Sequence, residues 1–218
     1  QAPQNYDPGD PKKLSGVRLG RLDGLDAAGI APEIADGFGR AVAMLADLGA
    51  DIVPVRLEGH DYGQLRRAGL IISEVEGAVV HAEDLTGRPD QLSDGLRTML
   101  SFGASLPATR LVQAQRDIAS ARVRVQKAFG NLDALIMPTA LQTAFDFDAP
   151  VPDNQADLTA IANLTDRPAV SVPMGLSPGG LPMGLQFLGR PFGEAAILRF
   201  ARAYELADGH DMRPRALD

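Results

Sequence analysis

The stretch Leu132–Glu205 reads LDALIMPTALQTAFDFDAPVPDNQADLTAIANLTDRPAVSVPMGLSPGGLPMGLQFLGRPFGEAAILRFARAYE, and it decides the fold of this chain. It opens on Leu132–Met137, an almost continuous apolar run that is typical of a strand buried on both faces of a sheet. Pro138 has no N–H to donate, so we expect it to end the strand ladder. Residues 141–156 are acidic and irregular, which predicts an excursion over the surface.

The second part of the stretch predicts three further features: a helix, a strand pair and a second helix. Ser177-Pro178-Gly179-Gly180 is a turn signal between two apolar segments, which favours an antiparallel strand pair. Asp157 or Thr159 is able to cap the helix that precedes this pair. The predicted elements are a short helix over Asp157–Leu164, strands over Ala169–Pro173 and Met183–Leu188, and a closing helix over Gly193–Leu206.

The beginning of the chain has the pattern of a strand–helix–strand unit. Val17–Leu22 alternates as a short strand, and apolar residues then recur at helical spacing from Pro32, a residue suited to the first turn of a helix. Gly49 suits the position just after a helix end. Asp51–Leu57 is the second strand, and Pro54 favours a sheet edge for it. A unit of this length predicts a parallel strand pair.

Three helical patterns in a row fill the middle of the chain, and we expect them to form a layer that covers a sheet. They span Tyr62–Leu85, Leu92–Ser105 and Leu106–Phe129. The sequence therefore predicts the α/β class. We expect an N-terminal loop or linker over residues 1–14, a folded part over residues 15–207 and a polar tail over residues 208–218.

Composition excludes several classes of partner. Of the 218 residues 45% are apolar, so a core can form, while the net charge of −7 argues against nucleic acid or an anionic membrane as partner. No apolar run approaches the roughly 18 residues of a membrane span. The N-terminus has no apolar core, so we do not expect a secretory signal, and we expect a cytoplasmic protein. The absence of cysteine rules out disulfides and thiolate chemistry.

The familiar chemical motifs are weak in this sequence. His81 and Asp84 could offer two metal ligands, but a lone pair on a helix favours a solvated helix end, and we predict no metal site. His60-Asp61 is interpreted as an ordinary loop pair. No GxGxxG pattern follows a strand. The serines considered as nucleophiles have no GxSxG turn around them, which favours a helix face for Ser73, Ser101 and Ser105.

Three polar residues are candidates for a substrate pocket. Thr139 is the first polar residue past the end of the buried strand, and ligands of open α/β sheets sit beyond such strand ends. Turn chemistry is the alternative role for Thr139. Thr159 and Asn163 lie four residues apart on one face of the short helix, where they either form structural hydrogen bonds or line a pocket.

Taken together, these segments resemble the amidase signature family. The residues that carry the resemblance are Asp133–Thr139, Thr159–Thr165, Arg167–Gly175, Gly180–Phe192 and Glu194–Glu205, with looser collinear matches at Asp7–Asp10, Val17–Gly20, Leu48–Ala50, Ser73–Glu76 and Arg116. The order and spacing are similar to the C-terminal end of that family. One departure is Asp166, where the family usually has glycine, although aspartate also adopts turn conformations.

The resemblance implies a fold and an activity. The fold would be the C-terminal part of a larger α/β/α protein with a mixed sheet, and the activity would be hydrolysis of a small-molecule amide without a cofactor. Family members use a serine nucleophile, a second serine and a lysine base in a segment N-terminal to the part represented here. This chain has no Ser-Ser pair, and its lysines are only Lys12, Lys13 and Lys127. We therefore expect no catalytic residue in it.

Two hypotheses follow from the resemblance. In the first, the chain supplies pocket wall and sheet scaffold, its partner is an N-terminal half that carries the Ser/Lys segment, and the isolated chain is inactive. In the second, it is a non-catalytic binding or interaction module derived from the amidase fold. Either hypothesis allows the protein to form a homo-oligomer.

Overall fold

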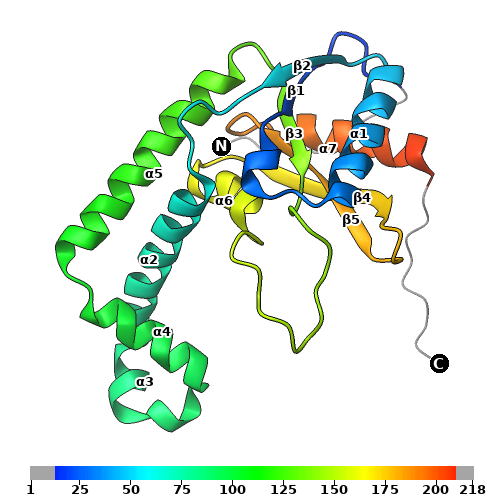
Figure 1. Cartoon of the computed structure of the whole chain (residues 1–218). Coiled ribbons are helices and arrows are strands. Elements are labelled where there is room, and N and C mark those ends of the chain that lie inside the picture. The colour runs from blue at the N-terminus through cyan, green and yellow to red at the C-terminus, as the bar shows by residue number, and fades with distance from the viewer. Residues whose placement is uncertain (1–12, 210–218) are drawn as a thin grey trace.

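A computed structural model describes residues 13–209, which form three layers, helices–sheet–helices (Figure 1). The predictions for residues 1–12 and 210–218 lie outside the described residues. The strands are β1 (Arg18–Leu22), β2 (Asp51–Val55), β3 (Ala134–Pro138), β4 (Ala169–Leu176) and β5 (Pro182–Gly189). The helices are α1 (Pro32–Asp47), α2 (Tyr62–Val80), α3 (Ala82–Gly87), α4 (Asp94–Ser105), α5 (Ala108–Phe129), α6 (Asp157–Leu164) and α7 (Glu194–Asp208), with 3₁₀ turns at Leu25–Ala28 and Pro89–Gln91.

The five-stranded sheet is mixed, in the order β2-β1-β3-β5-β4. β1 runs parallel to β2 and β3, whereas β5 is antiparallel to β3 and β4. The predicted parallel pair, the predicted hairpin and the edge position of the strand that contains Pro54 are all confirmed. Pro32 occupies the first turn of α1, and Gly49 follows the helix end with a φ of 97°, as the sequence pattern predicted.

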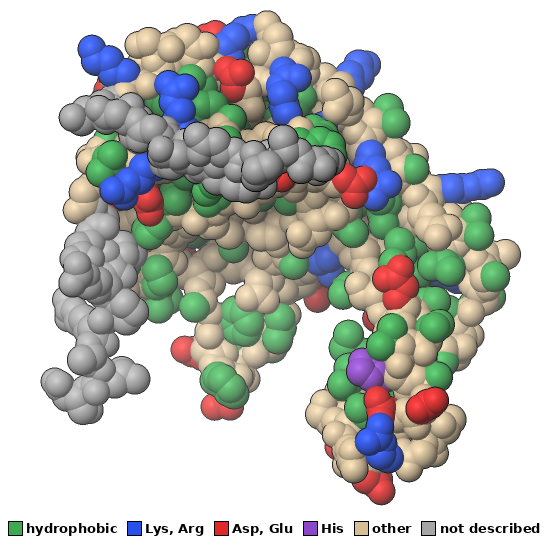
Figure 2. Space-filling view, turned by 180° about the vertical axis from the view of Figure 1, so that it is seen from behind, with side chains coloured by type: hydrophobic (Ala, Val, Ile, Leu, Met, Phe, Trp, Pro, Cys, Tyr) green, Lys and Arg blue, Asp and Glu red, His purple; other side chains and the backbone are tan. Residues whose placement is uncertain are grey.

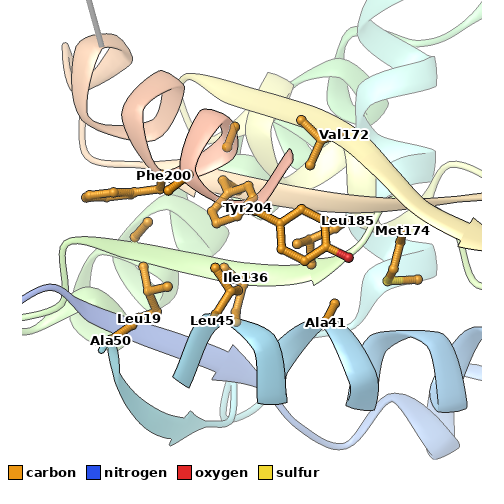
Figure 3. Packing of buried hydrophobic residues seen from close by; sticks show 14 of the residues in the cluster. Leu19, Ala41, Leu45, Ala50, Ile136, Val172, Met174, Leu185, Phe200 and Tyr204 are labelled. Carbon is orange, nitrogen blue, oxygen red and sulfur yellow. The ribbon is translucent and has the colours of Figure 1, made fainter. Parts of the chain in front are cut away.

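β3 is the centre of the molecule. Its residues from Ala134 to Met137 are all 0% exposed, which confirms a strand buried on both faces. Ala134 and Ile136 pack into the cluster beneath α1 and α7, where Ile136 lies close to Leu45 and Tyr204 (Figure 3). Leu135 and Met137 point to the opposite face and pack into the cluster beneath α2, α5 and α6.

Pro138 is the last residue of β3, so the strand ends at the proline as expected. It pairs with Leu185 of β5, and the N–H of Thr139 donates to the carbonyl of Gly184 at 2.7 Å. A proline removes only its own N–H, so the next residue can still donate one backbone bond to β5. The pairing with β5 therefore holds Thr139 in register at the end of β3.

The helices predicted as one covering layer divide into two groups. α2 and α5 cover the sheet together with α6, while α4 packs on α2 and extends beyond the sheet as an arm with α3 (Figure 1). Hydrophobic and charged side chains are interspersed on this arm in the view from behind (Figure 2). Within residues 13–209, none of the helices combines the length and the apolar character needed to cross a membrane.

The capping prediction for α6 was wrong. The residue at its N-cap is Ala156, and among the described residues no side chain caps the helix. The Asp157 carboxylate instead accepts a hydrogen bond from the Arg66 guanidinium at 2.7 Å, and the Thr159 hydroxyl donates to the Ala156 carbonyl at 3.2 Å. The long-range ion pair with α2 competes for the Asp157 carboxylate, which a local rule could not anticipate.

Two arginines tie the ends of the β4–β5 hairpin to the region where α5 leads into β3. Arg167, just before β4, lies with its guanidinium 4.0 Å from the centroid of the Phe129 ring and donates to the Gln126 side chain at 2.6 Å. Arg190, just after β5, donates to the carbonyl of Leu132 at 2.8 Å. The position of β3 and the position of the hairpin are therefore fixed together.

The α2–α4 contact depends on a glycine. A Cβ at Gly103 would lie 2.0 Å from the Glu74 carbonyl oxygen and 2.9 Å from the Val75 nitrogen, both backbone atoms. Because backbone atoms cannot rotate away, the two helices approach this closely only when residue 103 has no side chain.

We therefore expect Gly103→Ala to lower the free energy of unfolding by at least ~2 kcal/mol, since overpacking of this kind forces helices apart. Gly95→Ala is the matched control, because Gly95 lies in the same helix and a Cβ placed there would meet nothing within 4 Å. That control should leave stability unchanged or raise it by up to ~1 kcal/mol. Urea unfolding followed by circular dichroism makes the comparison, and equal stabilities of the two variants would contradict the close approach.

Candidate functional site

A cavity of about 550 Å³ opens beyond the carboxyl end of β3. Its walls come from α1, from the loop that follows β3, and from the β4–β5 hairpin. The lining residues are Ile34, Thr139, Ala140, Gln142, Thr143, Ala144, Gln155, Ser171, Val172, Pro173, Pro182, Met183 and Gly184. This is the position at which open α/β sheets bind ligands, and the structure places Thr139 there, as predicted from the end of its strand.

Two hydroxyl groups meet in this cavity. The Thr139 and Ser171 side-chain oxygens lie 2.5 Å apart, and either can be the donor. Thr139 follows β3 and Ser171 belongs to β4, so β5 runs between their backbones. A Cβ at Gly184 of β5 would lie 2.6 Å from the Thr139 hydroxyl and 3.0 Å from that of Ser171. The missing side chain of Gly184 is therefore what allows the two hydroxyls to meet across the intervening strand.

Gln142 contributes an unpaired carboxamide to the same wall. Its side-chain oxygen and nitrogen are both buried, and neither has a hydrogen-bond partner among the described residues. The residue as a whole is half-buried and belongs to the irregular segment that follows β3. Buried amide groups nearly always have partners, so this one points to a partner that the described residues do not provide.

Thr159 and Asn163 are not brought to this cavity. Thr159 is half-buried and bonds the carbonyl one turn before it. Asn163 is exposed and lines a separate surface hollow of about 700 Å³, beside the ion pair between Arg122 and Asp166. The substrate-binding role of Thr159 and Asn163 stays a prediction. Asp166 has a φ of 54°, so it adopts the turn conformation expected at this departure from the family pattern.

A second cavity, of about 540 Å³, lies beyond the carboxyl ends of β1 and β2. His60 lines it, and both ring nitrogens are buried without a hydrogen-bond partner among the described residues. Burial, and then the positive charge of Arg124, lowers the pKa of His60 below 6.5. Its ring centroid lies 4.6 Å from that of Tyr62, and burial raises the pKa of the Tyr62 hydroxyl to about 12. The interpretation of His60-Asp61 as an ordinary loop pair did not predict that the ring nitrogens of His60 are buried.

Ser171 and Gln142 of the first cavity were also not predicted from the sequence. Ser171 sits between apolar residues in Ala169–Pro173, and that alternation could have indicated a polar side chain on the outer face of a strand. Gln142 lies in an irregular segment, where no local pattern reports which way a side chain faces. Elsewhere, His81 bonds Asp84 at 3.1 Å, and no cluster of three metal-ligating side chains occurs within residues 13–209.

Comparison with known proteins identifies the family to which this sequence is similar. The sequence matches the family model described as Amidase over residues 1–198. The chain belongs to the amidase signature family. The match covers β3, Thr139 and β4 with Ser171, and it extends into α7.

Curated relatives are about twice as long as this chain. It is 31% identical to a glutamyl-tRNA(Gln) amidotransferase subunit of Symbiobacterium thermophilum over 234 aligned residues, which cover 94% of this chain and 48% of that protein. The corresponding protein of Myxococcus xanthus is 43% identical over 99 residues, or 43% of this chain and 20% of that protein. The chain therefore spans about half the length of curated relatives that match nearly all of it.

Solved structures support the same fold. A bacterial aryl acylamidase of the amidase signature family superposes with a TM-score of 0.77 at 20% identity, covering 89% of this chain and 44% of that chain. The glutamyl-tRNA(Gln) amidotransferase subunit of Thermotoga maritima gives a TM-score of 0.68 at 23% identity, covering 88% and 43%. The five-stranded sheet is thus part of an amidase signature fold.

The depressed pKa of His60 predicts a pH dependence of stability. Unfolding returns the imidazole to a pKa near 6.5, so below that pH the unfolded state binds more protons than the folded state. The contribution of neutral His60 is therefore present above pH ~6.5 and is lost as the pH falls through the lower folded pKa.

His60→Phe keeps an aromatic ring against Tyr62 but cannot titrate. We expect the free energy of unfolding to fall less between about pH 7.5 and about pH 5.5 in this variant than in the wild type. Urea unfolding at several pH values provides the measurement, and NMR titration of the His60 ring protons gives its pKa directly. Parallel stability profiles, or a pKa at or above 6.5, would show that His60 is not buried as described.

Proposed function

We propose that this chain is the C-terminal portion of an amidase signature hydrolase that cleaves carboxamide C–N bonds. The observation that carries the proposal is the family match over residues 1–198 combined with a cavity at the carboxyl end of β3. In this role the chain supplies the wall of the substrate pocket, with Thr139 and Ser171 at its centre and with Thr159 and Asn163 as the further predicted contacts. It also supplies the sheet on which the rest of the site is built.

The reacting groups come from outside this chain. A serine hydroxyl at its free pKa is inert and needs a positioned base. Ser171 shares its hydrogen bond with the hydroxyl of Thr139, which is not basic, and none of the described residues that line the cavity is a lysine or a histidine. Tetrahedral intermediates also need preorganised donors. We assign the serine nucleophile, the second serine, the lysine base and those donors to an N-terminal half that acts as the partner of this chain.

The outer edge of β4 is where that partner is expected. β4 is the last strand of the sheet order, and Ala169, Ser171 and Leu176 are exposed along it. An exposed strand edge presents unpaired backbone groups that another chain can extend. Because Ser171 lines the cavity from this same strand, a partner seated on the edge would face the Thr139–Ser171 pair.

A non-catalytic binding module is the alternative function. The observation in its favour is that this chain by itself buries the large side chains of its two hydrophobic clusters, with Phe129, Phe187 and Tyr204 almost completely buried. Such a module would remain monomeric and would not bind a hydrophobic dye. A portion that needs its other half would expose the apolar surface which that half covers.

The relatives differ in the reactions that they are known for. They include an aryl acylamidase and one subunit of a glutamyl-tRNA(Gln) amidotransferase, which are different amide chemistries. We propose that the reaction is hydrolysis of a small-molecule amide. It takes place in the cytoplasm and needs no cofactor.

We expect the isolated chain to hydrolyse no amide and to resist labelling by a fluorophosphonate, and we expect activity to appear when it is combined with its N-terminal partner. In the active complex, Thr139→Val should lower kcat/KM about tenfold, the loss expected for one hydrogen bond of ~1–1.5 kcal/mol.

Thr98→Val is the matched control. The Thr98 hydroxyl bonds the Asp94 carbonyl on an exposed face of α4, so this variant should keep its activity. Turnover and labelling of the isolated chain would overturn the assignment of the reacting groups. A stable complex that hydrolyses no amide would overturn the proposed function and favour the binding module.

A further inference from the structure

The described residues that line the cavity beside Thr139 include no charged side chain. Acidic and basic residues make up 22% of the chain, yet the lining consists of aliphatic residues, prolines, hydroxyls and two carboxamides. A carboxylate or ammonium group that enters such a cavity gives up hydration and meets no counter-charge, which is costly. The lining therefore discriminates against charged groups.

The polar group in the wall that lacks partners is a carboxamide. Gln142 has a buried oxygen, which accepts, and a buried NH₂ group, which donates, and neither is paired among the described residues. A buried amide without partners is destabilising, so a ligand that pairs with it gains affinity. Because the Gln142 side chain bonds no described residue, turning its amide towards a ligand in the cavity breaks no hydrogen bond within residues 13–209.

The chemistry of Gln142 defines what would satisfy it. A ligand amide or urea group offers an acceptor and a donor side by side, so it pairs with both ends of the glutamine carboxamide. A carboxylate has no donor and leaves the glutamine oxygen unpaired. An ammonium group has no acceptor and leaves the glutamine NH₂ unpaired.

The rest of the wall suits the apolar part of such a ligand. Ile34, Val172 and Met183 offer aliphatic surface, and all three are also part of the buried cluster beneath α1 and α7. The volume of about 550 Å³ lies in the range of small-molecule sites, about 300–1,000 Å³. The Thr139 and Ser171 hydroxyls can exchange donor and acceptor roles, so they adapt to either end of a neutral group.

We propose that this cavity is a specificity pocket for the part of the substrate that is not cleaved, that it accepts a neutral amide or urea group on an aliphatic or aryl body, and that Gln142 recognises this group. The inference rests on the proposed function in taking the ligand to be a substrate. The recognition itself depends only on residues of this chain.

The test uses three probes of one shape, benzamide, benzoate and benzylamine, with the full ¹⁵N-labelled 218-residue chain. We expect benzamide to shift the NMR signals of Thr139, Ser171 and the Gln142 side-chain NH₂, and benzoate and benzylamine to bind at least about tenfold more weakly. Gln142→Leu should weaken benzamide binding about tenfold, through the loss of two hydrogen bonds, and should weaken benzoate binding less, because a carboxylate pairs only with the glutamine NH₂ group.

Gln113→Leu is the matched control, because Gln113 is an exposed glutamine of α5 whose amide bonds Asp117. It should bind benzamide as the wild type does, and urea unfolding should show both variants to be folded. Gln142→Glu places a carboxylate in the wall and should raise the affinity for benzylamine. Equal affinity for benzamide and benzoate, an unchanged affinity in Gln142→Leu, or no benzamide binding up to its solubility would each overturn the inference.

These outcomes are separate from those of the proposed function. The NMR titration requires no hydrolysis, so an inactive complex leaves a positive titration intact and removes only the assignment of the ligand as a substrate. Conversely, an active complex whose Gln142→Leu variant keeps the wild-type preference among neutral and charged amides supports the hydrolase and contradicts the role of Gln142.

Discussion

Burial of β3 on both faces is the constraint on which the rest of the structure depends. Its side chains alternate between two hydrophobic clusters, so the helices on either side of the sheet pack against the same five-residue strand. Its backbone joins two kinds of pairing, parallel to β1 and antiparallel to β5. A strand in this position must be apolar throughout, since every side chain faces a helix layer and the backbone lies between two other strands.

The site is a consequence of that mixed pairing. Strands that run in one direction bring their carboxyl ends to the same end of the sheet, and β4 runs in the same direction as β3 because both are antiparallel to β5. Thr139 follows β3 and Ser171 belongs to β4, which is not a neighbour of β3, and the two side chains touch because Gly184 leaves space between them. In the sequence, Gly184 is one residue of an ordinary strand pattern. In the structure, the space that it leaves shapes the wall of the cavity.

The sequence by itself determined the elements and the family. Apolar periodicity, the Ser-Pro-Gly-Gly turn and the position of prolines and glycines are local signals, and they located the strands, the long helices, the parallel pair and the hairpin. The collinear motifs from Asp133 onward identified the family, which the match over residues 1–198 bears out. Thr139 could be predicted because the end of a buried strand is also a local feature.

Only the tertiary structure decided which side chains meet. The Thr139–Ser171 pair joins residues 32 positions apart, the Arg66–Asp157 ion pair joins residues 91 positions apart, and both depend on the register of strands and helices rather than on neighbouring residues. Gln142 belongs to an irregular segment without periodicity, so its burial follows from packing alone. Local propensity specifies backbone conformation, whereas the chemistry of a cavity is specified by distances between segments, which a single sequence does not encode in any local pattern.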